Sequence, residues 1–496
     1  MTRSLALAIA LLTTSVNAAE GVSSREYAAR RQLVASAIGP RSILVMFSAQ
    51  PARRNGSVEW PYRQNDNLYY LTGNTQPDSA LVLLPGEPAT SEVLFARERN
   101  PQQERWSGRI PSAEELRAGT GIATIAGADG LNGFIAAVLE GRSWSPAGRP
   151  LSFADPIAPS FSEAVRRGEA EVWLLMERRP PLDGDLPPVL EYAGRLRARY
   201  PEIRFRDATP VLRGLREVKT AAELELMRRA IDITGDAQLA AMRLAMTATN
   251  EKQIDDAIDR AYREGGACCW GFPSIVAAGA NATTLHYHAN DAVIRRGDLV
   301  LTDIGADYQG YTADVTRTYP AGGRFTAEQR AVHDAVFRAQ EEVIRIARAG
   351  NTWRELSDKA HQVLGEELLE LGLITRNEPE QVRMYFFHGI GHHVGLQVHD
   401  TGRYQQLRPG MVIAIEPGIY VRKDDVLASP TYAKLGEEEK SRVAGALERY
   451  NGIGVRIEDN VLVTGGAPEH LSRKAPRSAA DIEKFMNGAR VSSPAP

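Results

Sequence analysis

The chain has 496 residues, of which 43% are hydrophobic and 24% are charged, and its formal net charge is −3. These values are ordinary for a soluble globular protein with two or three domains and a large buried core. So small a net charge gives no electrostatic reason to expect nucleic acid or an anionic membrane as a partner. The composition therefore removes nucleic-acid binding from the functions to be considered.

The first 18 residues have the three parts of a secretory signal. Arg3 gives a basic start, an apolar run of eight residues covers 5–12, and Val16 and Ala18 stand before the cleavage point. This pattern predicts cleavage after Ala18. The apolar run is far shorter than the ~20 residues that span a bilayer, so a membrane anchor is the weaker interpretation. We expect an exported protein, periplasmic or secreted, with no membrane contact after cleavage.

The only two cysteines are adjacent, at Cys268 and Cys269. A framework of disulfides is excluded, because neighbouring Cα atoms lie about 3.8 Å apart and disulfides prefer a longer separation. We expect buried, reduced thiols, and a strained bridge between the two residues is the alternative. Neither thiol is expected to act as a nucleophile.

The distribution of histidine divides the chain into two halves. All nine histidines lie at or beyond His286, and histidine is the side chain most used for metal binding and proton transfer near neutral pH. In the first half, apolar runs alternate with helical patterns, which predicts an α/β domain over 19–214. The runs cover 41–47, 80–84 and 169–175, and the first helical pattern covers 24–37.

Two capping boxes mark helix starts in the second half. Thr220 is followed by Glu223, and Thr326 is followed by Gln329, so each pair can satisfy the free backbone N–H groups of a first helical turn. We place the domain boundary near 215 and the second domain over 215–490. Strands are expected at 298–306, 311–318, 411–421 and 453–464.

Two aspartates lie on a predicted hairpin. Asp303 and Asp314 flank a polar turn that contains glycine, and a turn centred between Tyr308 and Gln309 would place them directly opposite each other. Their Cβ atoms would then be about 5 Å apart on one face. Such carboxylates repel each other unless cations lie between them. Two solvated turn acids are the alternative, but Asp303 ends an apolar run, so we favour metal ligands.

A glycine-rich loop follows with four histidines in twelve residues. They are His388, His392, His393 and His399, interleaved with glycines at 389, 391 and 395. Glycine makes a regular helix unfavourable here and permits close backbone approach to a ligand. A single histidine is usually a structural residue, but four in such a loop favour a functional site.

Two further acids close apolar strands. Glu416 ends one strand and Glu458 ends another, and a buried acid is costly unless it is neutralised. Arg456 lies two residues before Glu458 and shares its strand face, so a structural ion pair between them is the alternative to metal binding.

These segments together offer four carboxylates and one imidazole, whose charge would balance two divalent cations. Oxygen-rich ligation suits Mn²⁺, and Zn²⁺ or Co²⁺ would also be accepted. Two such ions can activate water and polarise a carbonyl group. The proposed ligands are Asp303, Asp314, His392, Glu416 and Glu458.

The ordered motifs around these residues resemble the creatinase/aminopeptidase family of metallopeptidases, which has the pita-bread fold. The resemblance extends to the segment 60–73, which is similar to the N-terminal domain of the aminopeptidase P group. It implies an α/β N-terminal domain, an α+β pita-bread catalytic domain, and the five metal ligands. It also implies substrate-side roles for four residues and a proton-shuttle role for Glu416, with stabilisation of the tetrahedral intermediate by His399. The four are His286, His388, His399 and Arg456.

The resemblance implies release of the first residue from peptides with proline in second position, by an enzyme that forms a homo-oligomer. One departure is a charged insert at 421–451, which is similar in length to a loop of prolidases, enzymes that cleave only Xaa-Pro dipeptides. Prolidase is therefore the nearest alternative. Methionine aminopeptidases generally lack so large an N-terminal domain. Metal-free creatinase-type hydrolases and non-catalytic peptide-binding relatives are expected to lose ligands that this chain retains.

Overall fold

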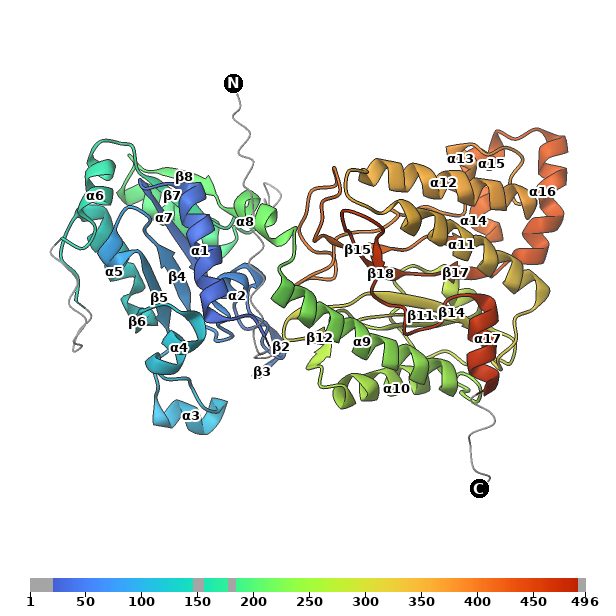
Figure 1. Cartoon of the computed structure of the whole chain (residues 1–496), viewed down its shortest axis with the longest axis horizontal. Coiled ribbons are helices and arrows are strands. Elements are labelled where there is room, and N and C mark those ends of the chain that lie inside the picture. Colours follow the sequence, from blue (N-terminus) through green and yellow to red (C-terminus); the bar gives the residue numbers. More distant parts are fainter. Residues whose placement is uncertain (1–20, 146–155, 177–183, 489–496) are drawn as a thin grey trace.

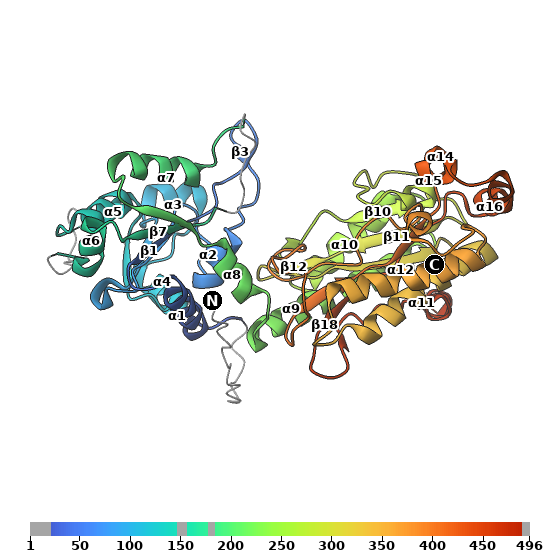
Figure 2. The same ribbon diagram turned by 90° about the horizontal axis from the view of Figure 1, so that it is seen from above.

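The computed structural model describes residues 21–145, 156–176 and 184–488, and it has two lobes side by side (Figures 1 and 2). The expected signal segment, 1–18, lies outside the described residues. Helix α8, Thr209–Arg216, leads from the first lobe to helix α9, Ala221–Leu244, of the second. The predicted boundary at 215 falls near the end of α8.

The first lobe is built on a six-stranded mixed sheet with the order β6-β5-β4-β1-β7-β8. Pairs β1–β4 and β4–β5 are antiparallel, whereas β1–β7, β7–β8 and β5–β6 are parallel. The strands are β1 Ser42–Phe47, β4 Ala80–Leu83, β5 Glu92–Ala96, β6 Thr124–Gly127, β7 Glu171–Leu174 and β8 Arg204–Asp207, and a separate hairpin joins β2 Arg53–Asn55 to β3 Val58–Glu59. The other helices of this lobe are α1 Ser24–Ile38, α2 Asp66–Thr72, α3 Pro101–Ser107, α4 Ala113–Thr120, α5 Leu131–Glu140, α6 Pro159–Arg166 and α7 Pro188–Arg199.

Side chains of β1 point alternately to the two faces of the sheet, and each face has its own hydrophobic core. Ile43 and Val45 pack with residues of α5, α6 and α7, whereas Leu44 and Met46 pack with residues of α1, α2, α4 and α8. Successive side chains of a strand point to opposite faces, so one buried strand supplies both layers. The predicted α/β architecture of this half is confirmed. The second core also includes Leu396 of the other lobe.

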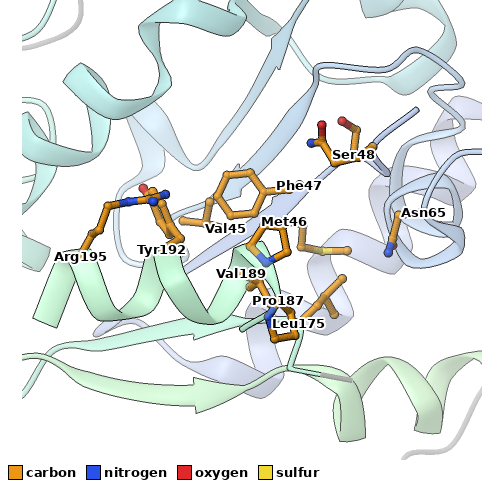
Figure 3. A pocket seen from close by; sticks show the side chains of 12 residues that line it. Val45, Met46, Phe47, Ser48, Asn65, Leu175, Pro187, Val189, Tyr192 and Arg195 are labelled. Atoms are coloured by element: carbon orange, nitrogen blue, oxygen red, sulfur yellow. The ribbon is translucent and has the colours of Figure 1, made fainter. Parts of the chain in front are cut away.

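A pocket of about 490 Å³ opens within this first lobe (Figure 3). Val45 and Phe47 of β1, Val189 and Tyr192 of α7, and Leu175 line it. Its walls are mainly apolar, and it belongs to the half of the chain that holds no histidine.

The second lobe places short strands between two helical layers, α9 with α10 and α11 with α12 (Figure 1). Its helices are α10 Glu251–Glu264, α11 Ala327–Ile346, α12 Trp353–Glu370, α13 Pro379–Val382, α14 Lys423–Ala428, α15 Pro430–Ala433, α16 Glu437–Tyr450 and α17 Ala479–Gly488. Its strands are β9 Cys269–Trp270, β10 Ile275–Ala278, β11 Leu299–Ile304, β12 Ala306–Tyr308, β13 Tyr311–Thr312, β14 Val315–Pro320, β15 Val412–Ile415, β16 Gly418–Tyr420, β17 Gly454–Arg456, β18 Asp459–Leu462 and β19 Glu469–His470. This arrangement is α+β, as predicted.

Both predicted capping boxes are present. The Thr220 hydroxyl accepts from the backbone N–H of Glu223 at the start of α9, and Thr326 and Gln329 form the same pair before α11. Each box satisfies two N–H groups that no earlier turn can bond. Within the described residues, no helix is long and apolar enough to cross a membrane.

The predicted hairpin register is wrong by two residues. Asp303 pairs with Thr316, not with Asp314. The turn consists of Gln309 and Gly310, both with positive φ (51° and 84°), which is the conformation of a two-residue hairpin turn. A register shift of two residues leaves every side chain on the same face of the sheet. Asp303 therefore keeps its predicted face, although its cross-strand partner changes.

The charged insert at 421–451 is folded. It forms α14, α15 and α16, and Val443 and Leu447 of α16 join the core of α11 and α12. In the described part of the chain, the ion pairs of this insert link it to itself or to Arg376, and none reaches the candidate centre below.

The expectation of buried thiols is wrong. Cys268 and Cys269 are free and exposed, because β9 is an edge strand that pairs only with β12 in its three-stranded sheet. An edge strand has one side without a neighbouring strand, which leaves its side chains accessible.

Candidate metal centre

Each predicted long strand of the second lobe is interrupted near an acid. Asp303 lies in β11 just before a break at Gly305, Asp314 lies between β13 and β14, Glu416 lies between β15 and β16, and Glu458 lies between β17 and β18. Glycine is required at the first break, because a Cβ at Gly305 would lie 1.9 Å from the carbonyl oxygen of Ala313. Asp314, Glu416 and Glu458 thus lie at breaks between strands, whereas Asp303 stays in the β11–β14 ladder.

The imidazole of His392 is the common neighbour of three acids. Its Nε2 lies 3.3 Å from Asp314 Oδ2 and 3.7 Å from both Glu416 Oε1 and Glu458 Oε1. Ligand atoms of Asp314, His392 and Glu458 all lie within 4.8 Å of one another. Three segments far apart in the sequence are thus brought to one point.

Hydrogen bonds orient these groups. His392 Nδ1 lies 3.1 Å from the carbonyl oxygen of His393, so Nδ1 carries the proton and Nε2 presents its lone pair to the acids. The hydroxyl of Thr316 donates to Glu458 Oε2 over 2.7 Å. The side-chain oxygen of Asn460 accepts from the backbone N–H of Asp314 over 3.0 Å, which fixes the chain at that acid.

The buried carboxylates are short of partners. Asp303 Oδ1, Asp314 Oδ1 and Glu458 Oε1 are buried without a hydrogen-bond partner. Burial and the neighbouring acid Glu458 raise the pKa of Asp314 and of Glu416 well above the ordinary range. Burial, followed by the charge of Asp303, raises the pKa of Glu458 to about 7. Orphaned oxygens on mutually repelling acids are what divalent cations neutralise, so the residues present fit a metal centre.

Asp303 and Arg456 form an ion pair beside this cluster. Arg456 Nη2 lies 2.6 Å from Asp303 Oδ2, and its Nη1 lies 3.0 Å from the hydroxyl of Tyr420. The structural ion pair considered between Arg456 and Glu458 is therefore replaced by one to Asp303. Tyr420 Oη also lies 2.9 Å from His388 Nε2. Sequence reasoning missed Tyr420, whose signal is its position four residues after Glu416 on the next strand.

The remaining candidate histidines surround the cluster. His388 Nδ1 lies 3.6 Å from Glu416 Oε2, and the rings of His392 and His399 have centroids 4.2 Å apart. Loss of solvation lowers the pKa of half-buried His388 to about 4, and it lowers that of His399 to about 4 although His399, like His286, is an exposed residue. His388 and His399 are therefore neutral at pH 7.

Asp400 ties the loop to the junction between the lobes. Its carboxylate is buried and pairs with Arg216 at the end of α8 and with Lys219 Nζ at 3.2 Å. These cations hold the pKa of Asp400 below its usual range in spite of its burial. Sequence reasoning missed all three residues, and adjacency to His399 is the signal that could have identified Asp400.

Two family descriptions match this chain and show the class of protein to which it belongs. The description "Metallopeptidase family M24" matches residues 225–465, and "Aminopeptidase P, N-terminal domain" matches residues 27–145. The Xaa-Pro aminopeptidase of Escherichia coli (strain K12) is 30% identical over 482 residues, which cover 95% of this chain and 99% of the relative. That of Haemophilus influenzae is 33% identical over 472 residues, covering 93% and 97%.

Solved structures of aminopeptidase P have the same fold as this chain. Aminopeptidase P from Escherichia coli with the inhibitor Pro-Leu superimposes with a TM-score of 0.78 at 28% identity, covering 95% of this chain and 100% of that one. Aminopeptidase PepP of Pseudomonas aeruginosa gives a TM-score of 0.79 at 29% identity, covering 95% and 100%. The chain belongs to the metallopeptidase family M24 and carries the aminopeptidase P type of N-terminal domain. The family and the fold class expected from the sequence are confirmed, and divalent metal use follows from the family.

Proposed function

We propose that this protein is an exported, dinuclear-metal aminopeptidase that releases the first residue from peptides with proline in second position. The observation that carries the chemistry is the gathering of Asp314 and Glu458 around His392 Nε2. Buried oxygens of Asp303, Asp314 and Glu458 that have no hydrogen-bond partner accompany it. The names of the relatives support the specificity, because they are Xaa-Pro aminopeptidases matched along almost their whole length.

The five predicted ligands would hold two divalent ions. His392 and the acids Asp314 and Glu458 form the tight cluster, Glu416 approaches the same imidazole, and Asp303 completes the set beside Arg456. Mn²⁺ is the ion that we favour for this oxygen-rich set, with Zn²⁺ and Co²⁺ as alternatives. When bound, such ions act as Lewis acids that activate water and polarise the scissile carbonyl group.

The other residues orient the substrate and move protons. Glu416 approaches His392 Nε2 to 3.7 Å, so its carboxylate is placed to receive a proton from water and return it to the leaving amine. His399 is neutral at pH 7 and can donate a hydrogen bond to an oxygen atom of the substrate. His388 is bonded through both ring nitrogens, to the carbonyl oxygen of Gly389 and to the hydroxyl of Tyr420, so a bond from His388 to the substrate would replace one of these. Arg456 holds the carboxylate of Asp303 in place through its ion pair.

His399→Ala should lower kcat by about 10²–10³-fold and change KM much less. The reason is that stabilisation of the tetrahedral intermediate appears only when charge develops on the substrate oxygen. Steady-state kinetics on an Xaa-Pro tripeptide measures both constants. His361→Ala is the matched control, because His361 bonds the carbonyl oxygen of Ser357 within helix α12 and should leave kcat unchanged. An unchanged kcat in His399→Ala would remove this residue from the mechanism.

Substrate length separates this proposal from prolidase. A prolidase closes its site with cations that bind the carboxylate of a dipeptide. In the 421–451 insert, Arg422, Lys423, Lys440 and Arg442 instead pair with acids of the insert itself. We therefore expect Xaa-Pro-Yaa tripeptides and longer peptides to be cleaved at the Xaa–Pro bond. A length series followed by chromatography tests this, and efficient cleavage of dipeptides with none of tripeptides would reverse the assignment.

Export is supported by the signal pattern of residues 1–18. Expressed with its own N-terminus in a Gram-negative host, the protein should appear in the periplasmic fraction or the medium with Ala19 as its first residue. N-terminal sequencing of each fraction decides this, and a chain that stays in the cytoplasm with Met1 retained would contradict it. Light scattering of the mature protein would test the expected homo-oligomer.

A further inference from the structure

The adjacent thiols lie at the junction of the two lobes. The backbone N–H of Cys268 donates to the carbonyl oxygen of Asp307 over 3.1 Å, and Cys269 pairs with Asp307 in the β9–β12 ladder. Arg63 of the first lobe makes an ion pair with the buried carboxylate of Asp307. Arg54 and Glu59 of the hairpin β2–β3 line one pocket together with Cys268 and Cys269. The backbone that carries both cysteines is thus held by β12, and Arg63 ties β12 to the first lobe.

A pocket of about 850 Å³ opens beside this strand and exposes both thiols. Trp60 and Arg63 line it from the first lobe, and Trp270 and Asp307 line it from the second. Both tryptophans are about half exposed, at 50% and 44%. A small solute can therefore reach the cysteines without unfolding of either lobe.

The two sulfur atoms are already in contact. Cys268 Sγ and Cys269 Sγ are 2.6 Å apart, which is closer than non-bonded sulfur atoms normally approach. In a regular strand, adjacent side chains would point to opposite faces, so the local conformation turns both sulfurs to the same side. The contact is the arrangement from which a bond between them could form.

The hydrogen bond between the two thiols gives them different pKa values. Either sulfur can donate in this contact. With Cys268 as the donor, the pKa of Cys269 is lowered and the pKa of Cys268 is raised. The negative charge of Asp307 raises the pKa of both thiols, and the positive charge of Arg63 lowers that of Cys269 by a smaller amount. Because the thiolate is the reactive form, Cys269 is the stronger nucleophile of the two.

We propose that Cys268 and Cys269 are a redox site, in which a reversible vicinal disulfide forms by exchange with small disulfides that enter the junction pocket. This site lies apart from the candidate metal centre and goes beyond the proposed peptidase function. The pocket walls are mainly apolar, and the charges of Arg54 and Arg63 stand beside those of Glu59, Asp66 and Asp307, so size and access select the oxidant, and oxidised glutathione serves as the probe.

The exchange balances with one molecule of oxidant. Cys269 thiolate attacks one sulfur of the small disulfide, forms a mixed disulfide and releases the first small thiolate, which takes up the proton that Cys269 lost. Cys268 then loses its proton and attacks Cys269 Sγ, which releases the second small thiolate to take up that proton. Two protein S–H bonds and one small S–S bond are replaced by one protein S–S bond and two small thiols.

The bridge should be easy to reduce. Neighbouring Cα atoms lie about 3.8 Å apart, below the range that disulfides prefer, so the ring is strained. Strained and exposed disulfides are the labile ones, which equilibrate with a glutathione pool instead of resisting it.

A glutathione titration of the full-length protein tests the proposal. After equilibration at a series of reduced-to-oxidised ratios, acid quenching and alkylation, the tryptic peptide 264–295 contains both cysteines and no others. We expect it to pass from two alkyl groups to none, with the loss of two hydrogen masses, and to return fully when the ratio is reversed. Two alkyl groups at every ratio, or a bridge that the most reducing buffer leaves intact, would overturn the proposal.

Single variants test the order of attack. Cys268→Ser should accumulate a mixed disulfide with glutathione at Cys269 quickly, whereas Cys269→Ser should react more slowly at Cys268, and the reverse order would overturn the assigned roles. The double serine variant is the control, because it should lose the mass change but keep the melting temperature and the peptidase activity. Since the readout is a peptide mass, its failure is distinguishable from failure of the proposed peptidase function.

Discussion

Removal of divalent metal is expected to abolish peptide hydrolysis and to lower the melting temperature by about 5–10 °C, with the larger loss at pH 8. Asp314, Glu416 and Glu458 are buried together, and three carboxylate oxygens of the centre have no partner. Cations would satisfy these oxygens, so the folded state should bind metal and the unfolded state should not.

The direction of the pH effect follows from the raised pKa values. The pKa of Glu458 rises from 4.5 to about 7 in the folded, metal-free protein, and those of Asp314 and Glu416 are shifted in the same direction. Protonated acids therefore stabilise the metal-free fold below about pH 4.5, and this contribution is lost as the pH rises through 7. Metal must displace these protons, so it binds more tightly at pH 8 than at pH 5.

The measurement is a thermal unfolding series of metal-loaded and metal-free protein at pH 5 and pH 8, together with elemental analysis and activity. About two ions per chain are expected in the active protein, because four carboxylates balance two divalent charges. Readdition of Mn²⁺ should restore activity and is the control for damage by the chelator. Full activity in a preparation shown to lack metal would contradict the proposed metallopeptidase and favour a metal-free hydrolase.

Glu416→Gln is expected to lower kcat by about 10²–10⁴-fold. The substitution keeps the shape of the side chain but removes a ligand charge and the group proposed to carry the proton. Glu416 lies 3.7 Å from His392 Nε2 and 3.6 Å from His388 Nδ1, so its loss should act at the reacting centre and not through the fold.

The melting temperature distinguishes an effect of Glu416→Gln on catalysis from an effect on the fold. In the metal-free state at pH 8, Glu416→Gln should unfold at the same or a higher temperature than the parent, since one of the mutually repelling acids is gone. Glu438→Gln, at an exposed position on α16, is the matched control and should leave kcat and the melting temperature unchanged. A Glu416→Gln enzyme with parental kcat would exclude Glu416 as the proton carrier.

Much of the candidate centre could be predicted from local patterns in the chain. The acids Asp303, Glu416 and Glu458 end apolar strands, where an unneutralised charge is costly, and glycines surround His392. Those patterns depend only on residue type and spacing, so one sequence contains them. The capped starts of α9 and α11 were predicted for the same reason, because a capping box is completed within four residues.

Partners across the fold could not be predicted in this way. The alternation of a strand determines which face a residue occupies, but the register depends on the turn, and here Gln309 and Gly310 move the partner of Asp303 to Thr316. For the same reason Arg456 was considered beside Glu458, its neighbour in sequence, whereas the structure pairs it with Asp303 from 153 positions away.

The sequence by itself therefore determined the family, the two kinds of domain and the residue types of the centre, because motif order and local spacing are properties of one chain. The tertiary structure alone decided which acids share the nitrogen of His392, that Asp400 ties the loop to Arg216, and that Cys268 and Cys269 are exposed. Burial and long-range pairing result from how distant segments pack, and no local pattern contains that information.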